Sequence, residues 1–252
     1  MSDLPAYVVI GASGGIATAV CQRLAKSGAR LLLVGRSPDK LQSLAASLQQ
    51  SNPAGQYEVF LADATKSAEI DAAFAKAIEL FGVIQGATNL VGSIILKPAH
   101  LTTDAELEET LSLNTRSAFY TVRAAAKSMM TTGGSVVLAS TVAASIGLMN
   151  HEAIATAKGA VNGLVLSAAA TYAPRNIRVN AVAPGLVKTP LASKITSSEL
   201  ALKASMAMHP LGRVGEPDDV AACIAWLLDP ATTWVTGQII GIDGGLGRVK
   251  AK

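Results

Sequence analysis

The chain has 252 residues, of which half are hydrophobic and 15% are charged. This composition is too apolar for a disordered chain and is sufficient for one large core, so we expect a single domain over residues 1–252. No uninterrupted apolar run reaches the roughly 18 residues of a membrane-spanning helix, which argues against a membrane partner. The 21 Lys and Arg residues exceed the 18 Asp and Glu residues by three and are scattered, which argues against a nucleic-acid partner.

The cysteines and the start of the chain indicate the compartment. Cys21 and Cys223 lie in separate helix-like segments and form neither a disulfide framework nor a metal-ligand cluster. Residues 1–5 lack the charged and apolar regions of a secretory signal peptide. We therefore expect a cytoplasmic protein with no bound metal.

Short runs rich in valine, isoleucine and leucine alternate with longer helical stretches rich in alanine and leucine. This alternation is typical of βαβ units around a parallel sheet. The runs show little polar alternation, which indicates strands covered on both faces. Seven strands are predicted, over residues 6–10, 30–34, 57–62, 83–89, 135–140, 177–183 and 238–242.

Proline and capping residues mark the ends of two predicted helices. Ser37-Pro38 places a cap residue before a first-turn proline and predicts a helix over residues 39–50, which Asn52 to Gly55 closes. Glu216 to Asp219 places acidic residues at a second helix start, and Asp229-Pro230 ends that helix.

Residues 186–208, here called the flap, are weakly patterned and lie between two proline-containing segments. A long connection of this kind is often a lid over a substrate pocket. Its apolar side chains indicate either an apolar substrate or a lid packed on the protein, and we expect the packed lid. They are Leu191, Ile195, Leu200, Leu202, Met206 and Met208. His100 and His209 have no partner in the pattern and are expected on the surface.

A glycine-rich turn follows the first predicted strand and opens a helix. Its candidate nucleotide-binding residues are Gly11, Ser13, Gly14, Gly15 and Ile16. Glycines allow backbone N–H groups to approach a diphosphate, and the helix N-terminus supplies partial positive charge. The spacing G-x-x-x-G between strand and helix therefore predicts a dinucleotide site, although a glycine turn of this kind can also be purely structural.

The end of the second strand indicates which dinucleotide is bound. A carboxylate there would bind ribose hydroxyls and repel a 2′-phosphate, but this chain has Arg36, whose guanidinium suits a phosphate. This predicts a preference for NADP(H), with NAD(H) possible, unless Arg36 is only a solvated loop residue. Asp63, after the third strand, could accept a hydrogen bond from the adenine amino group or cap a helix.

Further motifs occur in order along the chain. They are Asn89-Leu90-Val91-Gly92, Asn114, Ser140-Thr141, Lys158, residues 178–185 (RVNAVAPG), Thr189-Pro190, Thr236-Gly237-Gln238 and Asp243-Gly244-Gly245. Together with the glycine turn, they make essentially the whole chain resemble a short-chain dehydrogenase/reductase. The layout is similar to the β-ketoacyl carrier-protein reductase branch of that family.

The resemblance implies a fold and an activity. The fold is a Rossmann-type, doubly wound parallel sheet of seven strands with helices on both faces, in three α/β/α layers. The activity is hydride transfer between a nicotinamide and a carbonyl or alcohol of a small-molecule substrate. A homo-oligomer, dimer or tetramer, is also implied, with residues 110–130 and 153–172 as shared faces. Cofactor contacts beyond the glycine turn are implied for Asn89, Gly92, Lys158, Pro184, Gly185, Val187 and Thr189.

The same resemblance assigns catalytic roles. In the family a tyrosine gives the proton, a serine holds the substrate oxygen, a lysine binds ribose and lowers the phenol pKa, and an asparagine anchors a relay water. Asn114, Thr141 and Lys158 match three of these positions. Asn114 could instead kink or pack a helix, and Lys158 could instead be an ordinary surface lysine.

The tyrosine itself is missing, because the position four residues before Lys158 is Ile154. Residues i and i+4 share a helix face, but isoleucine can neither donate nor accept a proton. Thr141 stands thirteen residues before Ile154, where the family has serine. Adjacent Ser140 should point to the other side of an extended stretch. Leu90 also replaces the family's second asparagine.

Few other side chains could replace the phenol. His151, three residues before Ile154, has a near-neutral ordinary pKa and could give a proton, although it could equally line the pocket mouth or cap the helix. Tyr7, Tyr57, Tyr120 and Tyr172 all belong to other segments.

Two functions therefore stay open. The first is an NADP(H)-binding oxidoreductase with an unorthodox or weakened proton-donor site, in which Thr141 holds the oxygen and water or His151 gives the proton. The second is a catalytically silent nucleotide-binding module, acting as a sensor or scaffold. A deliberate replacement of the tyrosine is a third explanation of Ile154. The substrate is not identifiable from the sequence.

Overall fold

The computed structural model describes residues 4–249 and contains a seven-stranded parallel sheet. The strand order is β3-β2-β1-β4-β5-β6-β7, and every neighbouring pair is parallel. Residues 1–3, which form part of the amino-terminal segment considered above, lie outside the described range. The strands are β1 (Ala6–Ile10), β2 (Arg30–Gly35), β3 (Tyr57–Leu61), β4 (Gly86–Asn89), β5 (Gly134–Ala139), β6 (Ile177–Pro184) and β7 (Ile239–Ile242).

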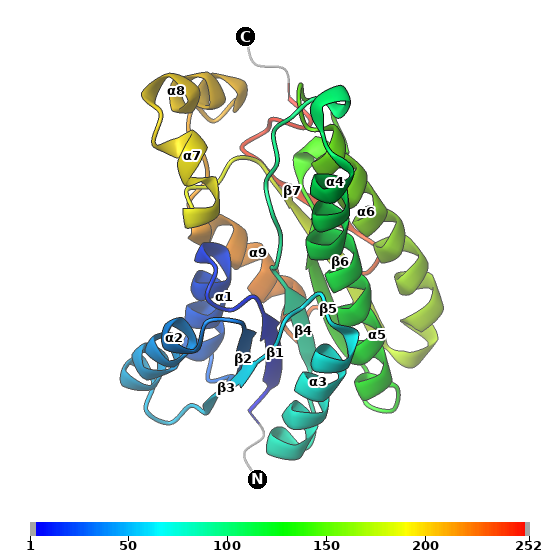
Figure 1. Ribbon diagram of the computed structural model, residues 1–252. Helices are drawn as coiled ribbons and strands as arrows, with labels where there is room; N and C mark the ends of the chain where they lie inside the picture. The colour runs from blue at the N-terminus through cyan, green and yellow to red at the C-terminus, as the bar shows by residue number, and fades with distance from the viewer. Residues whose placement is uncertain (1–3, 250–252) are drawn as a thin grey trace.

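Helices cover both faces of this sheet (Figure 1). The α-helices are α1 (Gly15–Lys26), α2 (Pro38–Ser51), α3 (Ser67–Phe81), α4 (Asp104–Leu111), α5 (Ser117–Met129), α6 (Glu152–Tyr172), α7 (Ser193–Thr196), α8 (Glu199–Met208) and α9 (Pro217–Leu228). Shorter 3₁₀ turns span Ala99–Leu101, Val142–Ala144, Ala173–Arg175 and Pro190–Ala192, and a π-helical turn spans Ser112–Arg116. This confirms the predicted three-layer α/β/α fold.

Each face of the sheet has its own hydrophobic core. Phe74 of α3 and Leu138 of β5 belong to the core beneath α3, α5 and α6. Leu24 of α1 and Ile224 of α9 belong to the core beneath α1, α2 and α9. Central strands therefore bury side chains on both sides, which explains their continuous apolar sequence.

The predicted strand boundaries agree with the structure to within one residue, except at the start of the fourth strand. It begins at Gly86 rather than at residue 83, because Val83 is 41% exposed and precedes the sheet. The predicted starts at Pro38 and Pro217 are confirmed as first-turn prolines. At the second of these, Glu216 and Asp219 form a reciprocal capping box.

The strand order reverses between β1 and β4. Connections from these two neighbouring strands run in opposite directions, so their carboxyl ends leave a crevice that neither connection fills. The glycine turn follows β1 at this crevice, and the motif Asn89 to Gly92 follows β4. The topology therefore brings together two motifs that are about 80 residues apart.

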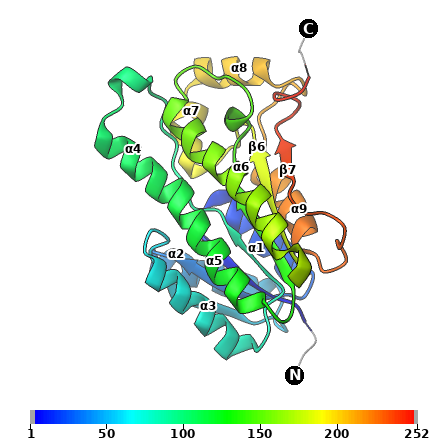
Figure 2. The same cartoon turned by 90° about the vertical axis from the view of Figure 1, so that its right-hand side faces the viewer.

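The flap folds into short helices beyond the carboxyl ends of the strands (Figures 1 and 2). The prediction of a packed apolar lid was wrong. Leu191, Leu200, Met206 and Met208 are all among the exposed large hydrophobic residues. Helices α7 and α8 are short and make few contacts with the rest of the fold, so these side chains stay exposed.

Helix α6 is the one helical stretch in the described part of the chain that is long and apolar enough to span a membrane. That stretch runs from Glu152 to Arg175. In the structure α6 packs against β6 and α5, and Val161 and Val165 are fully buried there. Burial in the protein core thus explains the apolar residues on one side of this helix.

Truncation of a side chain in the sheet core should destabilise the fold. Leu138 is completely buried, so Leu138→Ala should lower the free energy of unfolding by about 3 kcal/mol. Urea denaturation followed by circular dichroism measures this change. The matched control is Leu200→Ala, because Leu200 is 82% exposed, and its effect should stay within about 0.5 kcal/mol. Equal effects in the two variants would contradict the assigned core.

Candidate active site

The glycine turn joins β1 to α1 and is held by the neighbouring strand. The amide groups of Gly11 and Ala12 both donate to the Val34 carbonyl oxygen, at 2.9 and 3.1 Å. Gly11 has φ +79°, and a β-carbon there would lie 2.9 Å from a Val91 methyl group. Glycine is therefore required for conformation and for close packing.

The first turn of α1 is open to an anion. Its N-cap is Gly14, which has no side-chain cap, and the first turn carries no acidic residue. The amides of Gly15 and Ile16 have no carbonyl one helical turn before them within α1, and they carry the positive end of the helix dipole. Thr189 packs against Gly15, where a β-carbon would lie 3.0 Å from the threonine methyl group. These features fit the diphosphate of a dinucleotide.

Arg36 lies at the carboxyl end of β2 and is exposed. It lines a surface hollow of about 430 Å³ with Asp63, Thr65 and Glu109. Asp63 does not cap α3, whose N-cap is Lys66. Instead, Asp63 accepts hydrogen bonds from the Thr65 amide and hydroxyl. These bonds, together with the nearby Arg36 charge, lower the pKa of Asp63.

The loop after β4 is shaped by a buried asparagine. The Asn89 side chain donates to the Thr121 hydroxyl and accepts from the Val91 amide, both at 2.9 Å. These two bonds use both ends of the amide, so Asn89 acts on the site by fixing the backbone that leads to Gly92. Leu90, in the place of the family's second asparagine, lines the cavity and also packs against the core under α1.

Asn114 lies in the π-helical turn between α4 and α5 and is 1% exposed. Its amide nitrogen donates to the Thr110 carbonyl oxygen at 2.9 Å and to the Ser93 hydroxyl at 3.0 Å. Its carbonyl oxygen accepts from the Ser93 amide at 3.3 Å. A π-turn is a frequent feature of functional sites, and this one places Asn114 in the lining of the cavity. Ser93 was missed by the sequence analysis, and its position directly after Gly92 was the available signal.

Lys158 lies on the buried side of α6, one turn after Ile154, and both residues line the same cavity. Its ammonium group donates to the Ala139 carbonyl oxygen at 2.7 Å. Burial lowers the pKa of Lys158 to about 8, because the charged form loses its solvation. A β-carbon at Gly92 would lie 2.7 Å from the Asn114 carbonyl oxygen and 3.5 Å from the Lys158 nitrogen. Lys158 is therefore a cavity residue and not an ordinary surface lysine.

Two hydroxyl groups follow β5. Thr141 begins the 3₁₀ turn Val142–Ala144, and its hydroxyl accepts from the Ala143 amide at 3.3 Å. The Ser140 hydroxyl donates to the Asn162 side chain at 2.6 Å and is thereby engaged. Both residues line the cavity, and Thr141 is the one whose hydroxyl hydrogen has no acceptor among the described contacts.

His151 lies at the start of α6 but does not line the cavity. Its Nδ1 lies 2.7 Å from the Met149 carbonyl oxygen, to which it donates. All four tyrosines belong to residues 4–249, and none of them lines the cavity. Ile154 is 5% exposed, so an inert hydrocarbon occupies the position where the resemblance leads us to expect a phenol.

The cavity has a volume of about 200 Å³ and lies at the carboxyl ends of β1, β4, β5 and β6. A larger hollow of about 560 Å³ is lined by Gln85, Arg178 and Trp234 at the opposite ends of the strands and contains none of the predicted site residues. Six predicted site residues, Gly11, Ser13, Arg36, Asp63, Asn89 and His151, lie outside the cavity lining. The cavity does bring together Gly14, Gly15, Ile16, Gly92, Asn114, Thr141, Ile154, Lys158, Pro184, Gly185, Val187 and Thr189.

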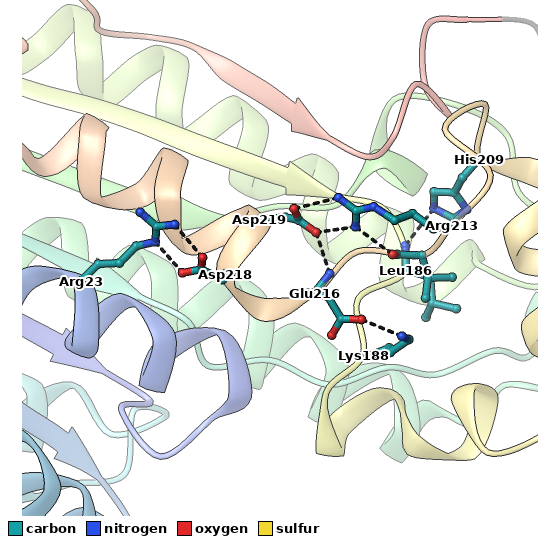
Figure 3. A network of polar contacts seen from close by, with 9 residues as sticks. Arg23, Leu186, Lys188, His209, Arg213, Glu216, Asp218 and Asp219 are labelled. Atoms are coloured by element: carbon teal, nitrogen blue, oxygen red, sulfur yellow. Dashed lines mark hydrogen bonds and ion pairs between the residues drawn. The ribbon is translucent and has the colours of Figure 1, made fainter.

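Polar contacts tie the base of the flap to α9 (Figure 3). Lys188 pairs with Glu216 at 2.6 Å, and Arg213 pairs with Asp219 at 2.6 Å. In the same first turn of α9, Asp218 pairs with Arg23 of α1. These pairs are largely exposed and each stabilises the fold only slightly, but together they position the segment that follows β6.

His209 is buried rather than on the surface, contrary to the sequence prediction. Its Nδ1 donates to the Ser205 carbonyl oxygen at 2.6 Å, and its Nε2 accepts from the Leu186 amide at 3.3 Å (Figure 3). A β-carbon at Gly185 would lie 2.5 Å from Nε2, so glycine is needed for the ring to fit. The first residue after α8 thus holds the first residue of the flap, a contact that no sequence spacing reveals. His100, by contrast, is exposed as predicted.

Comparisons with known proteins identify the family. The sequence model of the family described as enoyl-(acyl carrier protein) reductase matches residues 11–247. The chain belongs to this family of short-chain dehydrogenases/reductases. It is 34% identical over 242 residues to a galactitol 2-dehydrogenase (L-tagatose-forming) of Cereibacter sphaeroides, covering 94% of this chain and 92% of that protein. A tropinone reductase homolog of Arabidopsis thaliana is 32% identical, over 94% of this chain and 90% of its own.

Solved structures of this family have the same fold. A short-chain type dehydrogenase/reductase from Mycobacterium ulcerans superimposes with a TM-score of 0.92 at 32% identity and covers 100% of this chain and 93% of its own. An actinorhodin polyketide ketoreductase variant solved with NADPH has a TM-score of 0.91 at 25% identity, over 98% of both chains. The similar proteins are dehydrogenases and reductases, which makes this chain a member of an oxidoreductase family.

Loss of the His209 contacts should loosen the flap. His209→Leu keeps the volume but removes two hydrogen bonds, at a cost of about 1–3 kcal/mol. Trypsin cleavage at the exposed Lys194 or Lys203 should then become about tenfold faster, because local opening limits cleavage of a folded segment. Timed digestion with mass spectrometry measures the rate. His100→Leu is the control, and equal cleavage of both variants would contradict the anchoring role.

Proposed function

We propose that the chain is an NADP(H)-dependent oxidoreductase with a weakened proton-donor site. Its reaction is hydride transfer between the nicotinamide and a carbonyl or alcohol of a small-molecule substrate. The observation that carries this proposal is the cavity at the switch point, which unites the open start of α1 with Asn114, Thr141 and Lys158. The inert Ile154 in the same cavity supports the weakening.

The residues that would hold the cofactor surround the crevice. The amides at the start of α1 would bind the diphosphate, and Gly14 and Gly15 leave room for it. Arg36 would bind the 2′-phosphate, since it is exposed and has no ion pair among the salt bridges of residues 4–249. When bound, NADPH supplies a hydride to a carbonyl carbon. Lys158 would donate to the ribose hydroxyls. The segment Pro184 to Thr189 would border the nicotinamide.

The chain's own groups act on the substrate oxygen. The Thr141 hydroxyl would donate a hydrogen bond to that oxygen, which stabilises negative charge as it develops. The side chain of Ile154 excludes water without supplying a proton. Loss of a general acid typically costs about 10²–10⁴-fold in rate, so turnover should be slower than in a relative that has the phenol.

A second candidate is a catalytically silent nucleotide-binding module, and Ile154 is the observation that favours it. Titration of NADPH followed by its fluorescence, and then absorbance decay with a panel of carbonyl compounds, distinguishes the two functions. Binding with turnover supports the oxidoreductase. Binding without turnover supports the module, and no binding of either dinucleotide contradicts both.

We also infer a homo-oligomer in the cytoplasm, with α5 and α6 at the shared faces. The side chains of Phe119 and Leu166 are 52% and 57% exposed on these helices, which is consistent with contact to a second copy. The resemblance implies shared faces on the same two helices, so the exposed side chains and the resemblance favour the same surfaces.

Removal of the Arg36 charge should reduce selectivity for NADPH. Arg36→Ala should raise the Kd for NADPH by about 10- to 100-fold, because a charge-assisted hydrogen bond to phosphate contributes about 1.5–3 kcal/mol. The Kd for NADH should change little. Fluorescence titration of both nucleotides measures this, with Arg175→Ala as the control because Arg175 is exposed far from the crevice. Equal weakening of both nucleotides would contradict the phosphate role.

Restoration of the phenol should raise the rate of carbonyl reduction. Ile154→Tyr places a hydroxyl one helical turn before Lys158, and a gain of about 10²-fold is expected if the rest of the cavity is competent. Steady-state NADPH oxidation measures the gain. Ile154→Phe is the matched control, since it adds the ring without the hydroxyl and should give no increase. Equal rates for the two variants would mean that Leu90 and Thr141 have also changed the site.

A further inference from the structure

The cavity contains one titratable side chain. Of its 22 lining residues, Lys158 alone carries a group that ionises in water at accessible pH, and the others are glycine, alanine, proline, aliphatic, hydroxyl or amide residues. Hydroxyl and amide groups can orient a proton or pass it on, but they do not store one near neutral pH. The other side chains considered as proton donors, the four tyrosines and His151, do not line the cavity.

No salt bridge among residues 4–249 involves Lys158. Burial lowers its pKa, because the charged form loses its solvation. The groups that face it are neutral: the Ala139 carbonyl at the end of β5, Gly92 in the loop after β4, and Asn114 in the π-turn. The protonated Nζ has three N–H bonds and donates one of them to the Ala139 carbonyl oxygen. Two N–H bonds remain for other acceptors.

We propose that Lys158 is the proton donor of this enzyme, replacing the missing phenol. The inference rests on the proposed carbonyl reduction. As the carbonyl carbon receives the hydride of NADPH, the C=O π electron pair moves to the oxygen, and the Lys158 ammonium gives that oxygen a proton to form the alcohol. Lys158 is left as a neutral amine and regains its proton from solvent water, while the nicotinamide is left oxidised as NADP⁺.

This role has a definite pH dependence. Lys158 can donate only while protonated, and its lowered pKa is about 8. The fraction of protonated Lys158 is therefore close to one well below that pH, and it decreases as the pH rises through about 8. Reduction should slow on the alkaline side, and the reverse oxidation should accelerate over the same range, because the neutral amine is then the base.

Lys158→Arg tests the role, because arginine keeps the positive charge and the hydrogen bonds but does not release its proton. We expect NADPH binding by fluorescence to stay within about tenfold of the wild type, while kcat falls by about 10²-fold or more. Lys76→Arg is the control, since Lys76 pairs with Glu79 on the surface of α3 and should behave as wild type. Adding Ile154→Tyr to Lys158→Arg should restore turnover, because the phenol can then give the proton.

A second measurement does not depend on turnover. In protein labelled with ¹³C at the lysine ε-carbon, the resonance that disappears in Lys158→Arg should titrate near pH 8 without cofactor or substrate. Agreement between this titration and the alkaline decrease in kcat supports the proposal.

The possible failures are distinguishable. Wild-type turnover that persists in Lys158→Arg, or a Lys158 resonance that titrates near pH 10, overturns the donor role and leaves the oxidoreductase function standing. NADPH binding without reduction of any carbonyl between pH 6 and 9 overturns the oxidoreductase function and the donor role together. Loss of NADPH affinity in Lys158→Arg equal to the loss of turnover would show a binding role only, and this also overturns the proposal.

Discussion

The reversal of strand order between β1 and β4 is the constraint on which the site depends. Because every strand is parallel, each connection leaves from the same edge of the sheet, and at the reversal two neighbouring connections leave in opposite directions. The glycine turn and the loop containing Gly92 meet only at this point. The crevice also receives the segments that follow β5 and β6, and with Asn114 and α6 residues from six parts of the chain line one cavity.

Burial determines the chemistry available in that cavity. A lysine with a single carbonyl partner and no carboxylate loses solvation without a compensating charge, so its pKa decreases toward neutrality. The same apolar surroundings include Ile154, which supplies no proton. Lys158 is therefore the one ionisable side chain in the cavity lining, whereas the uncapped start of α1 has the features that fit a diphosphate.

The flap illustrates how tertiary contacts give a segment its role. Its exposed apolar residues do not pack as a lid, and only its ends are held in place. His209 binds the Leu186 amide, and Lys188 pairs with Glu216 at the start of α9. This arrangement leaves the middle of the flap with little burial, which is the physical condition for local opening above a substrate pocket.

The sequence by itself determined the layers and the order of strands and helices, because continuous apolar runs need burial on both faces and glycine, proline and capping residues mark local ends. It also located Gly14, Gly92, Thr141 and Lys158, and Ile154 at the position where the resemblance leads us to expect a phenol, since each lies in a short motif. Only the tertiary structure decided that Ser93 binds Asn114, that His209 is buried beside Gly185, and that His151 faces away from the cavity. These contacts join residues distant in sequence or depend on side-chain direction, and neither property is encoded in local spacing.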